Sequence, residues 1–333
     1  MEPGPWYWSR GRWRWNGREW QLRAFATALA LRGRDPATIT GLNDLVEIDA
    51  YKQGLRFFID RSGGKSTTAI VDLAGSLKAI ARHHLRLNQN HIDRLTTINR
   101  RLSVGPRALT EKNRGRLRQF DDPENVAALV GLPHKLIGIA SRKRNPRAGA
   151  LLAQIAAAIA ILTMAPIRLD NLRCLDIEQN LVRPSRRSKV LHVVVPASDV
   201  KNGQPVDHPL PLPSVALIER YLKEFRPHLA SPSCTAFFPG RRGGPKGANT
   251  LRGQIHQTIR SYTGLEMNPH LFRHATAKIY LDGNPGAYEV VRRVLGHRSG
   301  DTTFAYYTGL ETAAAVRHFD DTILKLGKSK SGR

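Results

Sequence analysis

The chain has 333 residues, 41% of them hydrophobic, and at roughly 150 residues per domain this length predicts about two domains with buried cores. Lys and Arg number 52 against 27 Asp and Glu, and the net charge of +25 is spread along the chain, with +9 up to residue 130 and +16 beyond it. A small acidic metabolite does not require so basic a surface, so the charge excludes it as the main partner and predicts a polyanion, most simply nucleic acid.

Cysteine usage and apolar segments indicate the compartment. The only two cysteines, Cys174 and Cys234, have no metal-ligand spacing, which predicts a reducing cytosol and neither a disulfide framework nor a structural zinc. The first twenty residues lack the uninterrupted apolar core of a secretory signal. Residues 148–165 approach the length of a membrane span, but half of them are Ala or Gly, which favours a buried core helix.

The first twenty residues form a Trp/Arg-rich segment that contains all five tryptophans of the chain. Alternating aromatic and guanidinium groups can stack on bases and neutralise phosphates, or they can pack as a short amphipathic strand or hairpin about Asn16-Gly17. Residues 21–122 then show helical patterning, which predicts an all-helical domain that ends near a hinge at Asp121-Asp-Pro-Glu124. The helical stretches of this region are expected at 66–87, 90–102 and 109–120.

Residues 123–326 predict a mixed domain. The core helix 148–165 is followed by a short helix through 170–175 and then by two strands, 190–196 and 205–210, around a turn at Lys201-Asn-Gly203. Further helices are expected at 214–226, 248–262 and 270–281, from a cap at Asn284-Pro285 to Gly296, and at 311–326. The fold class is therefore mainly α with a small antiparallel β-sheet.

The last helical stretch has apolar residues at helical spacing, and the chain ends in a basic tail. Ala313, Val316, Phe319, Ile323 and Leu326 can fold back on their own domain or dock onto a neighbouring protomer. The Lys/Ser/Gly tail, 327–333, is expected to be disordered.

The sequence lacks three motifs that are common in enzymes: a phosphate-binding loop, a metal site and a nucleophile elbow. Gly64-Lys-Ser-Thr67 lacks the upstream glycine and strand of a phosphate-binding loop. His83, His84 and His91 have no acids or cysteines at ligand spacing, so no metal site is predicted. A Gly-x-Ser-x-Gly nucleophile elbow is absent. We therefore expect no metal and no other cofactor.

Four pieces of the second half form an ordered constellation. Arg168 follows Ala165-Pro166, Lys201 stands at the turn, His270-Leu-Phe-Arg273 opens a helix, and Leu295-Gly-His297 precedes Tyr306-Tyr307-Thr-Gly-Leu-Glu311. In this order the pieces resemble the tyrosine recombinase, or phage-type integrase, family, and the similarity spans about residues 130–326. The preceding helical region resembles the core-binding domain of that family by position and character.

The resemblance implies a two-domain clamp on DNA, with a helical core-binding domain and a tyrosine recombinase catalytic domain. It implies a site-specific recombinase that integrates or exchanges DNA through a covalent 3′-phosphotyrosyl link, without metal or ATP. Two readings from other classes stay open: a catalytically inactive DNA-binding protein of the same fold, and a type IB topoisomerase that cleaves and reseals one duplex.

The resemblance also assigns roles to residues. Arg168 and Arg273 stabilise the phosphate charge, and Lys201 protonates the departing 5′ oxygen. His270 and His297 hydrogen-bond the phosphate, and one of them helps to remove the phenolic proton of the tyrosine. Tyr307 is preferred over Tyr306 as nucleophile because Tyr-Thr-Gly-Leu-Glu matches one local form of the family. His274 is expected to point to another side of its helix and to be structural.

The remaining expectations concern partners. Arg142, Lys143, Arg144 and Arg298 are predicted to contact the DNA backbone. The partner is double-stranded DNA, bound by a homotetramer on two duplexes with a dimer on each, together with accessory DNA-bending or directionality factors. We expect the protein in the cytoplasm, associated with the nucleoid, and away from membranes.

Overall fold

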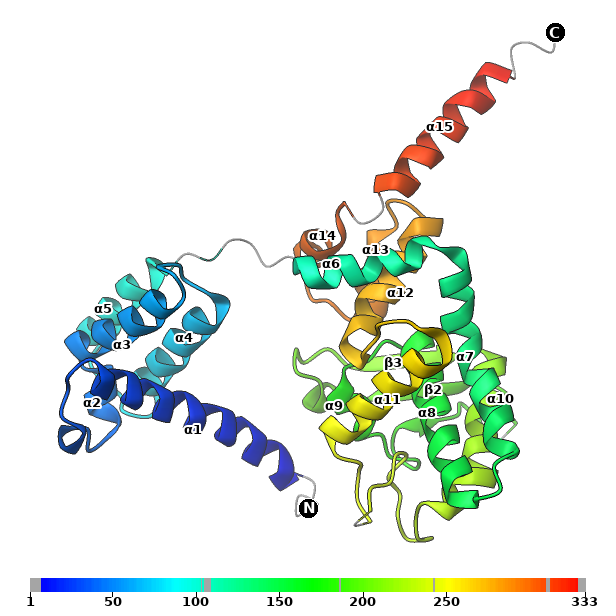
Figure 1. Cartoon of the computed structure of the whole chain (residues 1–333), viewed down its shortest axis with the longest axis horizontal. Helices are drawn as coiled ribbons and strands as arrows, with labels where there is room; N and C mark the ends of the chain where they lie inside the picture. Colours follow the sequence, from blue (N-terminus) through cyan, green and yellow to red (C-terminus); the bar gives the residue numbers. More distant parts are fainter. Residues whose placement is uncertain are drawn as a thin grey trace. The chain divides into compact units, whose positions relative to one another are not determined.

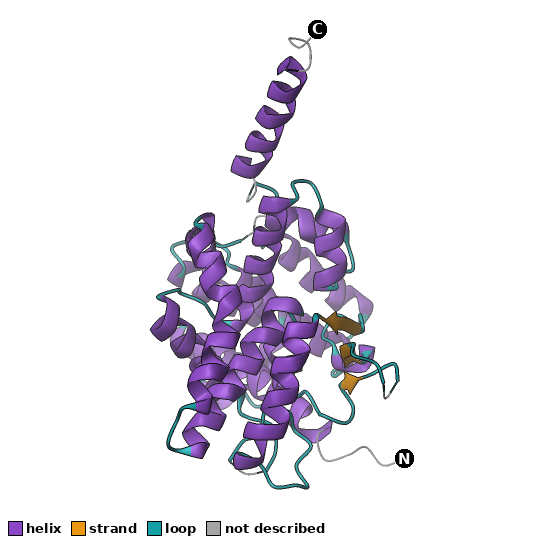
Figure 2. Cartoon of the chain, turned by 90° about the vertical axis from the view of Figure 1, so that its right-hand side faces the viewer, coloured by secondary structure: helices purple, strands orange, loops and turns teal. Residues whose placement is uncertain are grey.

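The computed structural model describes residues 7–102, 104, 109–185, 187–241, 243–309 and 312–328. It divides into two compact units, Met1–Pro106 and Arg107–Arg333. Most of the described residues lie in helices, and the strands form one small sheet in the second unit (Figure 1, Figure 2). The predicted fold class, mainly α with a small antiparallel sheet, is confirmed.

The first unit is all helical, as predicted. Its core contains Phe25 and Leu29 of the first helix, which pack with Tyr51 and Leu77. The Tyr51 hydroxyl donates to Asn99 Oδ1 at 2.7 Å, so this buried polar group has a partner. The elements are α1 (Tyr7–Leu31), η1 (Pro36–Thr38), α2 (Leu42–Val46), α3 (Ile48–Arg61), α4 (Thr68–His83) and α5 (Gln89–Arg100).

The Trp/Arg-rich segment corrects one expectation. Helix α1 runs through Asn16-Gly17, so a strand or hairpin about these residues is wrong. The helix is anchored further along, where Phe25, Ala28 and Leu29 are fully buried at helical spacing. Residues 1–6 lie outside the described residues, and the reading as a DNA-contacting arm stays a prediction.

The segment that joins the units packs with the second one. Leu117 and Phe120 are buried in the large core of that unit. Lys278 on α12 is 4% exposed and binds Asp121 Oδ1 at 2.6 Å. The expected domain boundary after residue 122 therefore lies inside the second compact unit, which begins at Arg107.

The second unit surrounds one apolar helix. Its α elements are α6 (Glu111–Leu117), α7 (Pro123–Ser141), α8 (Pro146–Met164), α9 (Leu169–Arg173), α10 (Leu212–Arg220), α11 (Ala248–Thr263), α12 (Pro269–Gly283), α13 (Tyr288–Leu295), α14 (Gly300–Tyr307) and α15 (Thr312–Lys328). Shorter turns are η2 (Arg118–Asp121), η3 (Ala197–Asp199), the π-type η4 (Tyr221–Phe225) and η5 (Arg226–His228). The strands are β1 (Leu181–Val182), β2 (Leu191–Val195) and β3 (Val206–Leu210).

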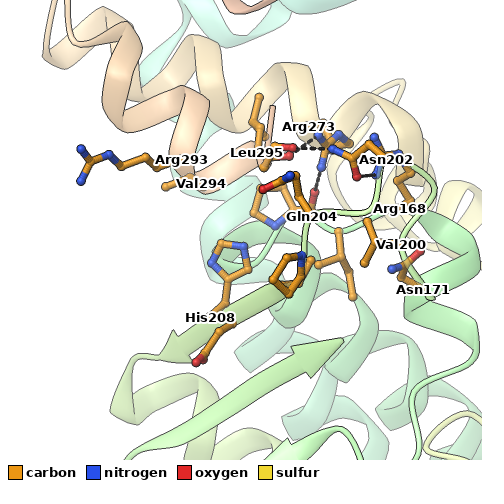
Figure 3. Close-up of a pocket in the computed structure, with 16 residues that line it drawn as sticks. Arg168, Asn171, Val200, Asn202, Gln204, His208, Arg273, Arg293, Val294 and Leu295 are labelled. Atoms are coloured by element: carbon orange, nitrogen blue, oxygen red, sulfur yellow. Dashed lines mark hydrogen bonds between the residues drawn. The ribbon is translucent and has the colours of Figure 1, made fainter. Parts of the chain in front are cut away.

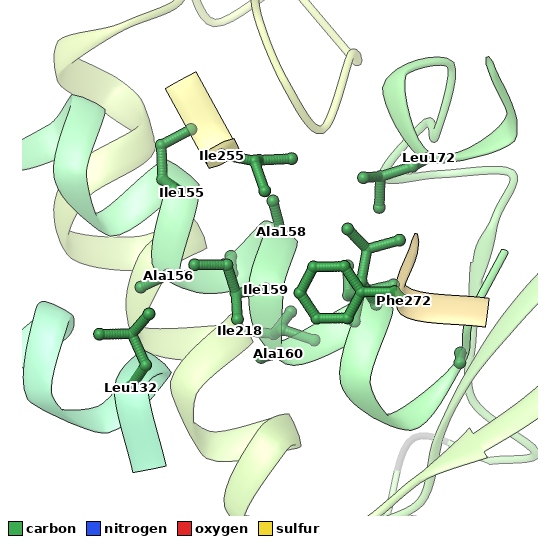
Figure 4. Close-up of a cluster of buried hydrophobic side chains, with 14 of the residues drawn as sticks. Leu132, Ile155, Ala156, Ala158, Ile159, Ala160, Leu172, Ile218, Ile255 and Phe272 are labelled. Carbon is green, nitrogen blue, oxygen red and sulfur yellow. The ribbon is translucent and has the colours of Figure 1, made fainter. Parts of the chain in front are cut away.

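Helix α8 occupies the centre of the core. Figure 4 shows Ala156, Ala158 and Ile159 of α8 among side chains of the helices around it. Small alanines let neighbouring helices approach closely, which explains why one helix can be covered on several sides. By length and composition α8 could cross a membrane, but 67% of its apolar window is buried inside the protein. The prediction of a buried core helix is confirmed.

The sheet has the strand order β1-β2-β3 and is antiparallel throughout. Strands β2 and β3 pair from Leu191↔Leu210 to Val195↔Val206. The predicted hairpin is therefore confirmed, but its connection spans residues 196–205 and includes η3 as well as the turn at 201–203. Strand β1 was not predicted because its two residues are too short to show alternation.

Several expected helix bounds differ from the structure; for example, the helix expected at 66–87 spans Thr68–His83, and the one expected at 214–226 ends as α10 at Arg220. Asn284 is the C-cap of α12, and α13 begins only at Tyr288, because Gly286 with φ +84° holds the chain in a turn after Pro285. The predicted end of α13 at Gly296 is confirmed, with Gly296 in the left-handed region at φ +61°. Helix α15 includes residues 327 and 328 of the expected tail, while residues 329–333 lie outside the described residues.

A matched pair of glycines tests the packing of the first unit. A Cβ on Gly54 of α3 would lie 2.3 Å from the buried Phe25 ring, whereas a Cβ on Gly75 of α4 would meet nothing within 4 Å. Gly54→Ala should destabilise the first unit by about 1–3 kcal/mol through overpacking. Gly75→Ala should stabilise it by about 0.5–1 kcal/mol through helix propensity.

Urea unfolding of the full chain, followed by circular dichroism, measures both effects. Equal changes in the two variants would contradict the described contact between α1 and α3.

Candidate active site

The site begins where α8 ends. Pro166 has no backbone N–H to continue a helix, and the chain leaves α8 at Ala165 before Arg168 caps the start of α9. Arg168 and Arg273 both line a cavity of about 230 Å³ between this junction, the β2–β3 connection and the end of α13. Asn202 and His208 line the same cavity (Figure 3). Arg168 and Arg273, which are more than a hundred positions apart in the sequence, thus line one cavity.

Arg273 is the most constrained side chain of the cavity. Its helix, α12, begins at Pro269 because Asn268 Oδ1 accepts from the backbone N–H of His270 at 3.0 Å. Arg273 is 8% exposed and donates from Nη1 to Pro166 O at 2.7 Å and from Nη2 to Leu295 O at 2.6 Å. These carbonyls are neutral, so they orient the guanidinium without cancelling its charge.

Arg168 adds a second positive charge to the cavity. It is half-buried, and its Nη1 donates to Asn202 Oδ1 at 3.2 Å. Burial lowers the pKa of Arg168. Burial and, next, the charge of Arg168 lower the pKa of Arg273 to about 10. Two half-buried or buried guanidiniums, one of which lowers the pKa of the other, favour the binding of an anion between them.

Helix α12 presents three polar side chains on one face. His270, Arg273 and His274 stand at i, i+3 and i+4, and the rings of His270 and His274 meet edge to face with centroids 5.5 Å apart. His274 is 8% exposed, and its Nδ1 forms a 3.0 Å hydrogen bond with the Tyr307 hydroxyl. The expectation that His274 points away from the others is therefore wrong, because the i+4 position returns to the same face.

His297 also contacts Tyr307, the residue to which His274 is hydrogen-bonded. It follows Gly296, and its Nδ1 is hydrogen-bonded to Oγ1 of the buried Thr303 at 2.9 Å. Its ring stacks on Tyr307 with centroids 6.4 Å apart and planes within 6°. Desolvation, then the charges of Arg273 and Arg168, lower the pKa of His297 to about 4. The same three causes lower the pKa of His270, although that residue is exposed.

The two adjacent tyrosines differ in environment. Tyr307 is 1% exposed, and desolvation raises the pKa of its hydroxyl. Tyr306 is half-buried, and its ring stacks on His274 with centroids 5.7 Å apart. Both tyrosines therefore contact His274, but the described hydrogen bond joins His274 to Tyr307. Leu310 and Glu311 of the sequence motif lie outside the described residues.

The structure does not bring every predicted residue to this site. Lys201 is exposed on the β2–β3 connection, one residue from the cavity-lining Asn202. Arg142, Lys143 and Arg144 are exposed where α7 joins α8, and Arg298 is exposed after His297. These four residues are open to a large partner and do not line the cavity between Arg168 and Arg273.

Sequence reasoning missed three residues of the site. Asn202 was read only as a turn former, yet its side chain contacts Arg168. Thr303, which is 0% exposed, holds the His297 ring. His208 on β3 lines the cavity, and desolvation lowers its pKa. The only signal for His208 was the alternation of β3, which places this polar residue on the same face as the buried Leu210. Within the described ranges, no three His, Cys, Asp or Glu side chains group to hold a metal ion.

Comparisons with known proteins extend these observations. Residues 139–313 match the model described as "Phage integrase family". No curated protein matches the chain. Among solved structures, XerA recombinase is 16% identical, with 95% of each chain covered and a TM-score of 0.41.

Two further solved structures have similar sequence identities and TM-scores. The Tn1549 transposon integrase in complex with circular intermediate DNA is 16% identical over 91% of this chain and 99% of that chain, with a TM-score of 0.48. A lambda integrase dimer bound to a COC′ core site is 15% identical over 88% and 94%, with a TM-score of 0.43.

The buried His274 makes stability depend on pH. Desolvation first, then the charge of His270, lowers its pKa from 6.5 to about 4, so the unfolded chain binds the proton more readily. This contribution to stability is complete above pH 6.5 and is lost as the pH falls toward 4. His274→Gln should reduce the loss of unfolding free energy over that range by about 1–3 kcal/mol.

Urea unfolding at a series of pH values, followed by circular dichroism, measures the effect. His134→Gln is the matched control, because His134 is exposed on α7 of the same unit. An unchanged pH dependence in His274→Gln would contradict the described burial of that ring.

Proposed function

The chain belongs to the phage integrase family of tyrosine recombinases, and from this premise we propose that it cleaves and rejoins double-stranded DNA at specific sites. The proposed intermediate is a covalent 3′-phosphotyrosyl link, and the biological role is DNA integration and recombination. The observation that carries the proposal is the convergence of Arg168 and Arg273 on one cavity, with the Tyr307 hydroxyl hydrogen-bonded to His274, the residue after Arg273.

The proposed chemistry begins with the phosphate. A scissile phosphodiester carries one negative charge, and attack by an oxygen nucleophile places more charge on its two non-bridging oxygens. A guanidinium has five N–H donors in a fixed fork, and Arg273 uses two of its nitrogens on main-chain carbonyls. The remaining donors of Arg168 and Arg273 bind the non-bridging oxygens. Positioned donors of this kind contribute most where charge develops in the transition state.

The nucleophile is the Tyr307 hydroxyl oxygen, which forms a bond to phosphorus while the bond from phosphorus to the 5′ oxygen breaks. Burial raises the pKa of Tyr307, so its proton must be removed during attack, and the hydrogen-bonded Nδ1 of His274 accepts it. The low pKa values of His274 and His297 leave both rings neutral near pH 7, with a lone pair able to accept a hydrogen bond. His270 and His297 bind the phosphate, and Lys201 gives a proton to the departing 5′ oxygen.

The reverse reaction uses the same groups. A 5′ hydroxyl of another strand attacks the phosphotyrosyl bond, Lys201 accepts its proton, and Tyr307 is released with its own proton returned by His274. The bond energy stays in the phosphotyrosyl link, so rejoining needs no separate energy source.

We assign the nucleophile to Tyr307 and not to Tyr306. Support comes from the hydrogen bond of Tyr307 to His274 and from its stacking on His297. Neighbouring residues on a helix diverge by about 100°, so one hydroxyl can reach the phosphorus while the other cannot.

The partner follows from charge and from the exposed residues. Arg142, Lys143, Arg144 and Arg298 are exposed, and we assign them to the DNA backbone, where each phosphate contact releases a counterion. With such a partner, the proposed location is the cytoplasm, at the nucleoid. Accessory DNA-bending or directionality factors belong to the same proposal.

The proposed assembly is a homotetramer on two duplexes, with a dimer on each. The last helix supports it, because α15 leaves Val316, Phe319 and Ile323 at least half exposed. An exposed apolar stripe of this kind is suited to packing against a neighbouring protomer.

A nicked duplex that carries the target site tests the covalent step. The nick lets the cleaved strand diffuse away, so wild-type protein should accumulate as an adduct that survives denaturing electrophoresis. Tyr307→Phe should give no adduct, because the attacking oxygen is absent. Tyr306→Phe is the matched control and should keep the adduct within about tenfold of the wild-type yield, since it alters only a neighbouring contact.

The outcomes separate the alternatives. Loss of the adduct in Tyr306→Phe alone would contradict the assignment to Tyr307. Tight DNA binding by the wild type without any adduct would favour an inactive DNA-binding protein. Relaxation of supercoiled plasmid without exchange between two sites would favour a type IB topoisomerase.

A further inference from the structure

Lys201 and Asn202 are the two central residues of a tight turn. The N–H of Gly203 donates to Val200 O at 2.9 Å and closes the turn, and Val200 is 7% exposed. Gly203 has φ +68°, whereas Asn202 is not among the described residues with positive φ. The backbone of the turn therefore needs glycine at 203 but does not need asparagine at 202.

The Asn202 side chain instead makes two contacts with distant segments. Its Oδ1 accepts from Arg168 Nη1 at 3.2 Å, and its Nδ2 donates to Gly296 O at 2.6 Å (Figure 3). Arg168 is a cavity guanidinium, and Gly296 directly precedes His297. One amide thus joins three segments of the site that are separate in sequence: the start of α9, the turn and the end of α13.

The chemistry of the contact is specific for asparagine. The two partners are a donor and an acceptor, and a carboxamide offers one group of each kind. Aspartate would keep the contact with Arg168 but place a carboxylate against the Gly296 carbonyl. Alanine would lose both contacts. Because the turn is otherwise tied to the body of the unit through Val200, the amide fixes how the exposed Lys201 stands relative to the cavity.

We propose that Asn202 is a positioning residue that holds the Lys201 turn against Arg168 and the His297 segment, so that Lys201 is placed to protonate the 5′ oxygen. The inference rests on the proposed function and on the role of Lys201 in it. Asn202 itself does not touch the phosphate in this scheme. A displacement of the turn by about 1 Å is enough to cost on the order of 10²-fold in rate.

The test uses a leaving group that needs no proton. In one nicked duplex the 5′-bridging oxygen of the scissile phosphate is kept, and in a second it is replaced by sulfur. A thiolate departs unprotonated near neutral pH far more readily than an alkoxide, so the sulfur duplex bypasses Lys201. Initial rates of covalent adduct formation are measured for the wild type, Lys201→Ala, Asn202→Ala, Asn202→Asp and the control Ser198→Ala. Ser198 is exposed on η3 of the same connection.

We expect Asn202→Ala to be slowed by about 10²-fold on the oxygen duplex and to recover to within about tenfold of wild type on the sulfur duplex. Lys201→Ala should show the same recovery, and Ser198→Ala should match the wild type on both duplexes. Asn202→Asp should be slowed and should recover similarly, and it tests the idea independently should Asn202→Ala fold poorly.

Three results would overturn the inference. A wild-type rate for Asn202→Ala on the oxygen duplex would show that the amide contacts are dispensable. Slow cleavage of both duplexes by folded Asn202 variants, with Lys201→Ala recovering, would reduce Asn202 to a structural role and leave the proposed function intact. No recovery of Lys201→Ala would refute the assigned role of Lys201 and this inference with it.

Discussion

The site depends on a buried guanidinium held by two main-chain carbonyls. Arg273 joins the end of α8, through Pro166 O, to the end of α13, through Leu295 O, while its own helix supplies His270 and His274. A buried guanidinium is costly to desolvate and is tolerated because its N–H groups are bonded. Because both acceptors are neutral, the positive charge remains available to a ligand. The same two bonds therefore stabilise the fold and prepare the site for an anion.

The protonation states of the groups around Arg273 follow first from burial and only then from nearby positive charge. Desolvation and the nearby guanidiniums keep His274 and His297 neutral, and burial keeps Tyr307 protonated. An imidazole beside a phenol can accept its proton only when a negative phosphate offsets the local positive charge. Binding of DNA would thus alter the protonation balance at the point where attack begins. In the proposed reaction, the Tyr307 side chain, which is 1% exposed, must first be uncovered.

Much of this arrangement could be predicted from the sequence. The apolar composition of residues 148–165 predicted the core helix, and Gly296 predicted the end of α13. Contacts that depend on packing could not be predicted in the same way. The 2.6 Å bond of Asn202 to Gly296 crosses 94 positions, and no local pattern indicates it. Local signals also failed at Asn16-Gly17, a common turn dipeptide, because the buried remainder of α1 continues the helix through it. They failed again at His274, because the i+4 position of a helix brings its ring back to the face of His270.

The central claim is that paired guanidiniums stabilise charge on one phosphate, and a neutral phosphate analogue tests it most directly. Arg168 is the better residue to remove, because Arg273 also satisfies two carbonyls of the fold. Arg168→Ala is expected to lose about 10²–10³-fold in adduct formation on an ordinary nicked duplex. With a methylphosphonate at the scissile position, which lacks one charged oxygen, the variant should come within about tenfold of the wild type, since less charge needs stabilisation. An equal defect of Arg168→Ala on both duplexes would contradict the claim.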